Sequence, residues 1–206
     1  MLPMRIRKTI KSIVKKIWRY PICKYYQKKL KNDRFTIISS DCVGGCLYHD
    51  LGLRFNTPTI NLTVPRSIDF FERLEYYLQV MPVPNGYTQK GQPVMLLDDL
   101  EVVGVHYRDH DELIDKWHER KNRVVWDHII IISSSRFIVT EEDRERFAKL
   151  PYPKVLFSGN QTNNSYEVYA PAVAQNKDLT AYCDCFGRRY FERYLNCVQF
   201  LNQSIQ

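Results

Sequence analysis

The chain has 206 residues, 44% of them hydrophobic, and a formal net charge of +7. This length fits one large domain better than two, and the hydrophobic fraction is that of a globular protein with an ordinary core. The most apolar run, Ile129 to Ile132, is far shorter than the roughly 20 residues that cross a bilayer, so no transmembrane helix is expected. The N-terminus lacks the apolar core of a secretory signal, so a cytoplasmic protein with reduced thiols is expected.

The positive charge is concentrated at the N-terminus. Residues 1–34 hold twelve lysines and arginines and one acid, a net charge of +11, whereas residues 35–206 hold 18 basic and 22 acidic side chains. The body of the protein is therefore mildly acidic, and the basic character belongs to an N-terminal arm. Because the basic residues do not continue onto the body, nucleic acid is not an expected partner.

Residues 4–19 place isoleucines, a valine and a tryptophan at helical spacing, with lysines and arginines between them. This pattern predicts a basic amphipathic helix that ends before Pro21, within an arm of residues 1–33. Such a helix suits an anionic membrane surface, and the alternative is a helix that packs its apolar stripe on the body or on a partner. Removal of residues 1–30 is expected to abolish vesicle binding and to leave the fold intact.

From residue 34 onward, strands alternate with helices. The expected strands lie at residues 35–40, 59–64, 94–97, 101–107, 128–133 and 154–158. The expected helices lie at residues 42–50, 68–80, 110–123, 140–150 and 187–202. Asp98 and Asp99 form a hairpin turn, Asp109 caps a helix, and Trp126 is expected in the core with the strand after it. The alternation predicts an α/β fold with a mostly parallel sheet in a single domain of residues 34–206.

The turn from Asp41 to Gly45 joins the first strand to the first helix. Ligands bind to α/β sheets at the carboxyl ends of strands, and helix N-termini favour phosphate or carboxylate groups. Gly44 and Gly45 would let a ligand approach closely, with Asp41 and Cys42 beside it. A tight turn in which Asp41 caps the helix fits the same residues. Cys42 fits a nucleophile with a lowered pKa and also a small buried residue.

Two histidines are candidates for general acid–base chemistry, because an imidazole exchanges protons near neutral pH. His49 follows Asp41 within about two helical turns, beside Tyr48, and His106 ends an apolar strand just before Tyr107. His106 is the preferred catalytic candidate, since the end of its strand can lie next to the turn. The two tyrosines would then contact the same ligand. Surface or packing roles fit both histidines as well.

A metal site has two possible sources in this sequence. Asp109-His110-Asp111 matches the DxD pattern with which metal-dependent nucleotide-sugar glycosyltransferases hold a divalent ion, yet acids in a first helical turn also stabilise the helix. The cysteines form no CxxC pair, so no metal site is assigned from them and the cofactor is unknown. No P-loop, GxSxG or HExxH motif supports the mechanisms that depend on those motifs.

Several blocks of sequence occur in an order that resembles one bacterial family. They are DCVGGCLYHDLGLRFNTPTINLTV, LEVVGVHYRDHDELIDKWHERKNRVVWDHIIII, FAKLPYPKVLFSG and RRYFERYLNCVQFLN. From about Arg34 to Asn202, the chain is similar to domain-of-unknown-function family 1919, whose members are often labelled exopolysaccharide biosynthesis proteins. The resemblance implies a three-layer α/β/α domain with a place in surface-polysaccharide assembly. It brings no established catalytic residues.

Two functions are therefore expected. The first is a transferase of exopolysaccharide or capsule biosynthesis at the inner face of the membrane, which moves a sugar from a nucleotide-sugar to a membrane-bound acceptor. His106 or His49 would deprotonate the acceptor hydroxyl, and the Asp41 turn would contact the sugar or the diphosphate. The second is a non-catalytic binding or assembly protein of a polysaccharide-synthesis complex. Convergence of His106, Tyr107 and the Asp41 turn in one pocket would favour the enzyme.

Overall fold

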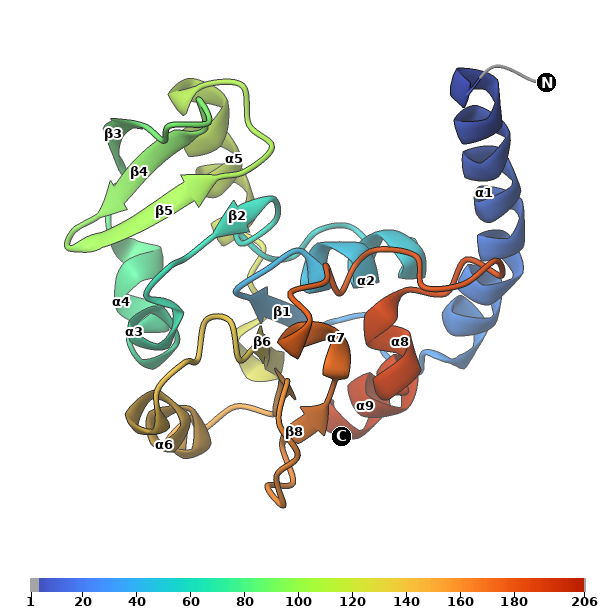
Figure 1. Ribbon diagram of the computed structural model, residues 1–206. Coiled ribbons are helices and arrows are strands. Elements are labelled where there is room, and N and C mark those ends of the chain that lie inside the picture. The colour runs from blue at the N-terminus through green and yellow to red at the C-terminus, as the bar shows by residue number, and fades with distance from the viewer. Residues whose placement is uncertain (1–3, 206) are drawn as a thin grey trace.

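A computed structural model describes the backbone of residues 4–205 and the side chains of residues 17–205 (Figure 1). The chain forms a mixed α/β fold with two four-stranded sheets. The first sheet is parallel and has the strand order β1 (Thr36–Ser39), β6 (Ile129–Ser134), β7 (Lys154–Ser158), β8 (Glu167–Tyr169). The second sheet is antiparallel and has the order β2 (Leu62–Thr63), β5 (Leu100–Gly104), β4 (Pro93–Leu97), β3 (Val83–Tyr87).

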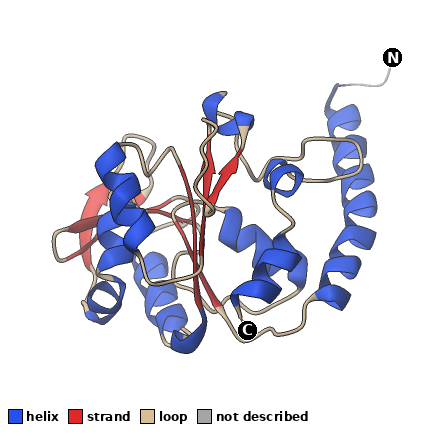
Figure 2. Cartoon of the chain, turned by 90° about the horizontal axis from the view of Figure 1, so that it is seen from below, coloured by secondary structure: helices blue, strands red, loops and turns tan. Residues whose placement is uncertain are grey.

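Helices connect the strands of the two sheets. They are α1 (Met4–Lys29), α2 (Val43–Leu51), α3 (Ser67–Glu72), α4 (Leu74–Gln79), α5 (His110–Lys121), α6 (Glu141–Lys149), α7 (Pro171–Ala174), α8 (Tyr190–Tyr194), α9 (Cys197–Ser204) and the short 3₁₀ turn η1 (Trp126–His128). Figures 1 and 2 show α1 at one side of the molecule, and Figure 1 shows its N-terminal half extending beyond the body. Across residues 4–205, none of the helices combines the length and the apolar character that a membrane span needs.

Strand β6 shows why the sequence requires a sheet that is covered on both faces. Ile129 and Ile131 belong to a core cluster with the second sheet and α3 to α6, whereas Ile130 and Ile132 belong to a cluster with α2 and α7 to α9. Successive side chains of a strand point to opposite faces, so a continuous isoleucine run serves two cores at once. The buried strand is thus confirmed. The prediction for Trp126 is wrong, because this residue lies in η1, before the strand, and is 48% exposed.

The first helix is longer than expected, since α1 passes through Pro21 and ends only at Lys29. A proline inside a helix removes one hydrogen bond and costs stability, so contacts elsewhere must hold the following turns. Arg19 is buried, and Tyr26 and Leu30 pack against the core cluster beneath α2. These contacts with the body stabilise the second half of α1.

Two helices that were expected to be continuous are each divided. Residues 68–80 form α3 and α4, which meet at Arg73. Residues 187–202 form α8 and α9, with the break at Leu195 and Asn196. The Asn196 side chain accepts a hydrogen bond from the Gln199 N–H group at 3.2 Å and so starts a new helix.

The antiparallel sheet is the main feature that was not expected. Residues 81–93 belong to none of the expected strands or helices, yet they contain β3, whose sequence VPNGY is exposed throughout and holds a proline and a glycine. The strand predicted at residues 59–64 is reduced to β2. The hairpin at Asp98 and Asp99 is confirmed, because β4 and β5 pair on either side of it and Asp98 has a φ angle of 59°.

Candidate functional site

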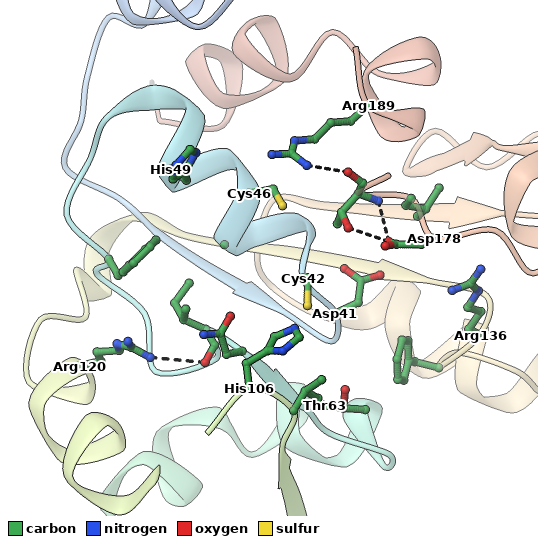
Figure 3. A pocket seen from close by; sticks show the side chains of 18 residues that line it. Asp41, Cys42, Cys46, His49, Thr63, His106, Arg120, Arg136, Asp178 and Arg189 are labelled. Atoms are coloured by element: carbon green, nitrogen blue, oxygen red, sulfur yellow. Dashed lines mark hydrogen bonds between the residues drawn. The ribbon is translucent and has the colours of Figure 1, made fainter. Parts of the chain in front are cut away.

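A cavity of about 670 Å³ lies beside the carboxyl ends of β1 and β6 (Figure 3). Its wall combines the turn into α2 and the segment after β6 with residues of the second sheet and of α5. The segment between α7 and α8 closes another side. This volume is in the range of pockets that bind small molecules, and its place at strand ends is the common one in α/β folds.

Five of the residues singled out from the sequence line this cavity. They are Asp41, Cys42, Gly45, His49 and His106. Figure 3 shows His106 pointing toward the turn that carries Asp41 and Cys42, although the histidine follows β5 of the other sheet. The packing of the two sheets therefore brings the preferred catalytic histidine to the predicted ligand-binding turn.

Gly44 and Tyr48 do not belong to the cavity wall, contrary to the expectation that they contact a ligand. A Cβ atom on Gly44 would lie 3.0 Å from Ile37 Cγ2 and 3.0 Å from Ser39 Cβ, so this glycine lets α2 pack closely on β1. Tyr48 is fully buried and donates a hydrogen bond from its hydroxyl to the Phe35 carbonyl at 3.0 Å. Both residues hold α2 against the sheet.

Tyr107 lies behind the wall rather than in it. Its hydroxyl donates a hydrogen bond to the Ile60 carbonyl at 2.8 Å and accepts one from Arg120, and both partners line the cavity. The guanidinium group of Arg120 also lies over the Phe55 ring, 5.6 Å from its centroid. Tyr107 therefore positions Arg120, and of these two residues only Arg120 lines the cavity.

Asp41 serves both the turn and the cavity. Its Oδ1 atom accepts hydrogen bonds from the Val43 N–H group at 3.0 Å and from the Ser39 hydroxyl at 3.2 Å. Burial raises the pKa of Asp41 above its usual value, although these hydrogen bonds and the charge of Arg136 oppose the rise. A carboxyl group with a raised pKa in a cavity is suited to proton exchange.

The two cysteines of the wall are poor nucleophiles. Burial raises the pKa of Cys42 to about 11, and nearby carboxylates add to the rise. Burial also raises the pKa of Cys46 to about 11. Both thiols are therefore protonated near neutral pH, so of the two roles open for Cys42 the small packed residue is favoured over the nucleophile.

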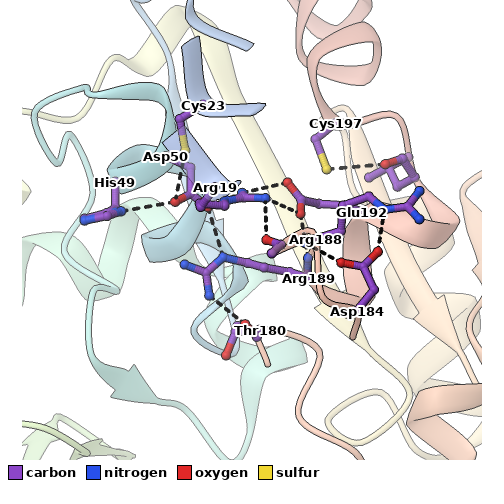
Figure 4. A network of polar contacts seen from close by, with 12 residues as sticks. Arg19, Cys23, His49, Asp50, Thr180, Asp184, Arg188, Arg189, Glu192 and Cys197 are labelled. Carbon is purple, nitrogen blue, oxygen red and sulfur yellow. Dashed lines mark hydrogen bonds and ion pairs between the residues drawn. The ribbon is translucent and has the colours of Figure 1, made fainter. Parts of the chain in front are cut away.

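Asp50 is the centre of a buried polar network behind His49 (Figure 4). His49 Nδ1 lies 3.1 Å from Asp50 Oδ1, while Arg19 and Arg189 bind Oδ2 of the same carboxylate at 2.6 Å and 3.0 Å. Burial opposes the ionisation of Asp50, but the hydrogen bonds from the two arginines outweigh it and hold its pKa below the usual value. Arg189, which lines the cavity, is fixed further by a hydrogen bond of 2.6 Å to the Thr180 carbonyl.

Arg120 and Arg136 add positive charge to the cavity wall. Arg136 donates a hydrogen bond to the Lys177 carbonyl, and Arg120 binds the Tyr107 hydroxyl. Among the side chains of residues 17–205, neither guanidinium group forms an ion pair with a carboxylate. Guanidinium groups without a carboxylate partner suit an anionic ligand such as a phosphate.

The sequence alone does not show that Arg120, Arg136 and Arg189 line one cavity. Arg120 lies on a helix, Arg136 in a loop after a strand and Arg189 just before α8, so no short motif groups them. Their convergence depends on how the two sheets pack.

Asp109 and Asp111 lie outside the cavity wall. Asp109 accepts hydrogen bonds from the Glu112 N–H group at 2.9 Å and from Arg108 Nε at 2.7 Å, so it acts as the cap of α5. The DxD pattern is thus explained by helix capping. Within the part of the chain that the structure describes, no group of three His, Cys, Asp or Glu side chains is arranged to hold a metal ion.

Comparison with known proteins identifies the family of this chain. A family model described as "Domain of unknown function (DUF1919)" matches residues 13–202. The chain belongs to the DUF1919 family. A relative from Haemophilus influenzae that carries the name "Uncharacterized protein" is 33% identical in an alignment of 206 positions that covers 95% of this chain and 97% of the relative.

The DUF1919 match extends the resemblance that the sequence blocks suggested. It starts at residue 13, within α1, rather than near Arg34. Every residue that lines the cavity lies inside the matched range, as does Arg19. The cavity and the network behind it are therefore parts of the DUF1919 domain.

Proposed function

We propose that this DUF1919 protein is a group transferase of bacterial exopolysaccharide or capsule biosynthesis, and that glycosyl transfer from a nucleotide-sugar is its reaction. The observation that supports this proposal most is the convergence of His106, Asp41, Arg120 and Arg136 in one cavity of about 670 Å³. A proton-accepting group, a carboxyl group and positive charge are parts that such a transfer can use.

The cavity wall suits the two ends of a nucleotide-sugar. Arg120 and Arg136 supply charge for a diphosphate, which binds guanidinium groups through charge-assisted hydrogen bonds. Phe55 and Ile60 offer apolar surface for a base or for the face of a sugar ring. Gly45 leaves room beside Ile60, because a Cβ atom there would stand 3.4 Å from Ile60 Cδ1.

In the proposed step, His106 acts as the general base. The acceptor hydroxyl oxygen bonds to C1 of the sugar while its proton passes to the imidazole. The bond from C1 to the diphosphate oxygen breaks, and the nucleoside diphosphate leaves with the electron pair, stabilised by the arginines. His106 is exposed, so it can return the proton to water after each turnover.

The layered architecture that the family resemblance implies is part of this proposal. In it, the parallel sheet is the middle layer of a three-layer domain. The division of β6 side chains between two core clusters supports this arrangement. The cavity then lies at the carboxyl edge of the middle layer, where α/β folds bind their ligands.

We place the enzyme at the inner face of the cytoplasmic membrane, where lipid-linked acceptors lie. The basic amphipathic sequence of residues 4–19 and the net charge of +11 over residues 1–34 support contact with anionic lipids. Each lysine or arginine near such a surface contributes on the order of 1 kcal/mol.

The proposed donor is tested by thermal unfolding of the full chain with a panel of nucleoside diphosphate-sugars. A ligand that binds only the folded state, at about 100 times its Kd, stabilises it by about 2.7 kcal/mol. We expect one donor to raise the melting temperature of the wild type and of Arg54→Gln, an exposed control outside the cavity, but not of Arg136→Gln. No shift with any donor, or equal shifts in both variants, would contradict the proposal.

A non-catalytic role is distinguished by combining donor binding with a test of His106→Ala in cells. If a donor binds but His106→Ala leaves polysaccharide production unchanged in cells, the protein is a binding or assembly component. Arg120 and Arg136 would serve such a component equally well, whereas His106 would have no role.

A further inference from the structure

The outward side of α1 carries exposed aromatic and apolar side chains where a helix of a globular protein would normally be polar. Ile17 is 64% exposed, Trp18 51% and Tyr25 58%. The opposite side of the same helix faces the body, where Arg19 and Tyr26 are buried or partly buried. The apolar residue Ile17 therefore points away from the domain, which excludes body packing as its role.

A second segment contributes to this surface. Phe186, which precedes α8, is 53% exposed and lies against Trp18 with 6.0 Å between the ring centroids and 87° between the ring planes. Figures 1 and 2 both show the loop before α8 beside α1. Trp18 and Phe186 thus form one exposed aromatic pair from two distant parts of the sequence. The neighbouring residues Arg19 and Gly187, which are 168 residues apart in sequence, are joined by a hydrogen bond.

Lysines lie among these aromatic side chains. Lys24 Nζ is 5.6 Å from the centroid of the Tyr20 ring, and Lys29 Nζ is 5.9 Å from that of Tyr25. Among the described side chains, Lys24 and Lys28 form no ion pair. In membrane proteins, aromatic side chains often lie at the level of the lipid headgroups, and nearby lysines extend their charged ends toward the phosphates and water.

We propose that Phe186 and the outward side of α1 over residues 17–28 form one docking surface for an anionic lipid bilayer. Trp18 and Phe186 enter the headgroup region, and Lys24 and Lys28 contact lipid phosphates. The surface is part of the DUF1919 domain as well as of the arm. The proposal depends only on the membrane location in the proposed function. The transferase chemistry is not assumed.

Charge complementarity selects the bilayer over a second copy of this chain. The side of α1 that would meet the partner is basic, and a second copy would present the same lysines to it. Like charges that face each other across an interface are unfavourable, whereas an anionic leaflet attracts them. In sequence, Ile6, Ile10 and Ile13 precede Ile17 at intervals of three or four residues, which extends the same apolar spacing toward the N-terminus.

Vesicle flotation of the full chain tests this surface, with phosphatidylglycerol-containing vesicles and pure phosphatidylcholine vesicles. Trp18→Ser and Phe186→Ser are each expected to weaken partition to the anionic vesicles about tenfold, since an inserted aromatic side chain is lost. The matched controls are Trp126→Ser and Tyr87→Ser, which are 48% and 55% exposed elsewhere and should bind like the wild type. All four variants change exposed residues, and their melting temperatures should match the wild type.

Tryptophan fluorescence gives an independent readout. In Trp126→Phe, the remaining tryptophans are Trp18 and the buried Trp117, so a blue shift on vesicle addition reports on Trp18. A blue shift with anionic vesicles supports the proposal. If the wild type floats but Trp18→Ser and Phe186→Ser behave like their controls, the docking surface is wrong while the membrane location stands.

Two further outcomes would also overturn the proposal. If the wild type binds neither kind of vesicle, the docking surface and the membrane location both fail, and the transferase proposal is untouched. If the chain instead forms concentration-dependent oligomers that Phe186→Ser abolishes, the surface is a protein interface.

Discussion

Neighbouring residues of the turn into α2 have different roles, and Gly44 and Gly45 show this most clearly. A Cβ atom on Gly44 meets the backbone-proximal atoms of β1 at 3.0 Å, whereas one on Gly45 meets only the tip of Ile60 at 3.4 Å. We predict that Gly44→Ala destabilises the fold by about 1–3 kcal/mol through overpacking. Gly45→Ala should be neutral or more stable by up to about 1 kcal/mol, because alanine favours the helix.

Chemical denaturation of the two alanine variants measures this difference. Gly45→Val, in contrast, should keep the fold and reduce donor binding, because its side chain enters the cavity beside Ile60. Equal stability of Gly44→Ala and Gly45→Ala would show that Gly44 does not pack against β1.

Asp41 is a residue whose ionisation costs stability. Because its folded-state pKa is raised, the carboxylate is unfavourable above that pKa, and stability is recovered as the pH falls through it. We predict that Asp41→Asn raises the melting temperature near pH 7, since the amide oxygen can still accept from the Val43 N–H group. The gain should vanish at acid pH, and transferase activity should be lost. A lower melting temperature at neutral pH would show that the charge stabilises the turn.

At the scale of elements, the network around Asp50 joins α1, α2 and the start of α8. Its carboxylate is 1% exposed and binds Arg19 and Arg189, while Glu192 binds Arg19 from the other side at 2.6 Å. Breaking a buried ion pair by removing one partner typically costs about 3–5 kcal/mol. The network therefore fixes Arg189 in the cavity wall and α1 on the body.

The pH dependence of this network has the sign opposite to that of Asp41. The folded-state pKa of Asp50 is lowered, so its contribution is complete above the usual aspartate pKa of about 3.9 and is lost as the pH falls through the lowered value. We predict that Asp50→Asn destabilises the fold by about 3–5 kcal/mol near pH 7, and that the difference from the wild type shrinks below about pH 4. Urea denaturation measures both effects.

Asp115→Asn is the matched control for this comparison, because Asp115 is exposed on α5. Its stability should follow that of the wild type at every pH. A difference between Asp50→Asn and the wild type that persists unchanged into acid would mean that the lost interaction is steric rather than electrostatic.

Elements with a strong local pattern could be predicted, and those that depend on tertiary contacts could not. The apolar run of β6 and the Asp98 turn carry their own signals, because burial on two faces and a left-handed turn restrict which residues fit. The strand β3 carries no such signal, since its sequence is exposed and is held only by pairing with β4. The break at Asn196 is a local cap that helical periodicity obscured.

The residues of the site also divide into those that the sequence indicates and those that only the fold brings together. Asp41 and His106 could be singled out because each follows a strand, which is a property of the chain alone. Arg136 and Arg189 could not, because they reach the cavity from loops whose paths depend on the packing of the whole domain. Tyr48 and Gly44 looked like site residues because sequence proximity to the turn does not show which side of α2 faces the sheet.

At the scale of the whole molecule, the arm and the body are joined at Arg19. The expectation that residues 1–30 can be removed without loss of the fold is replaced by a sharper prediction. Removing residues 1–16 should leave the melting temperature unchanged, because the network remains complete. Removing residues 1–30 should destabilise the fold by about 3–5 kcal/mol, because it leaves Asp50 and Glu192 buried without Arg19. Equal melting temperatures of the two truncated chains would contradict this.

The central claim is that the cavity is a transferase site in which His106 is the general base. Its most direct test is single-turnover transfer of a labelled sugar from the bound donor to a lipid-linked acceptor, with donor affinity measured in parallel. We predict that His106→Ala binds the donor with unchanged affinity and transfers it roughly 10²–10⁴-fold more slowly, while His118→Ala, outside the cavity, behaves like the wild type. Transfer by His106→Ala at the wild-type rate would contradict the account.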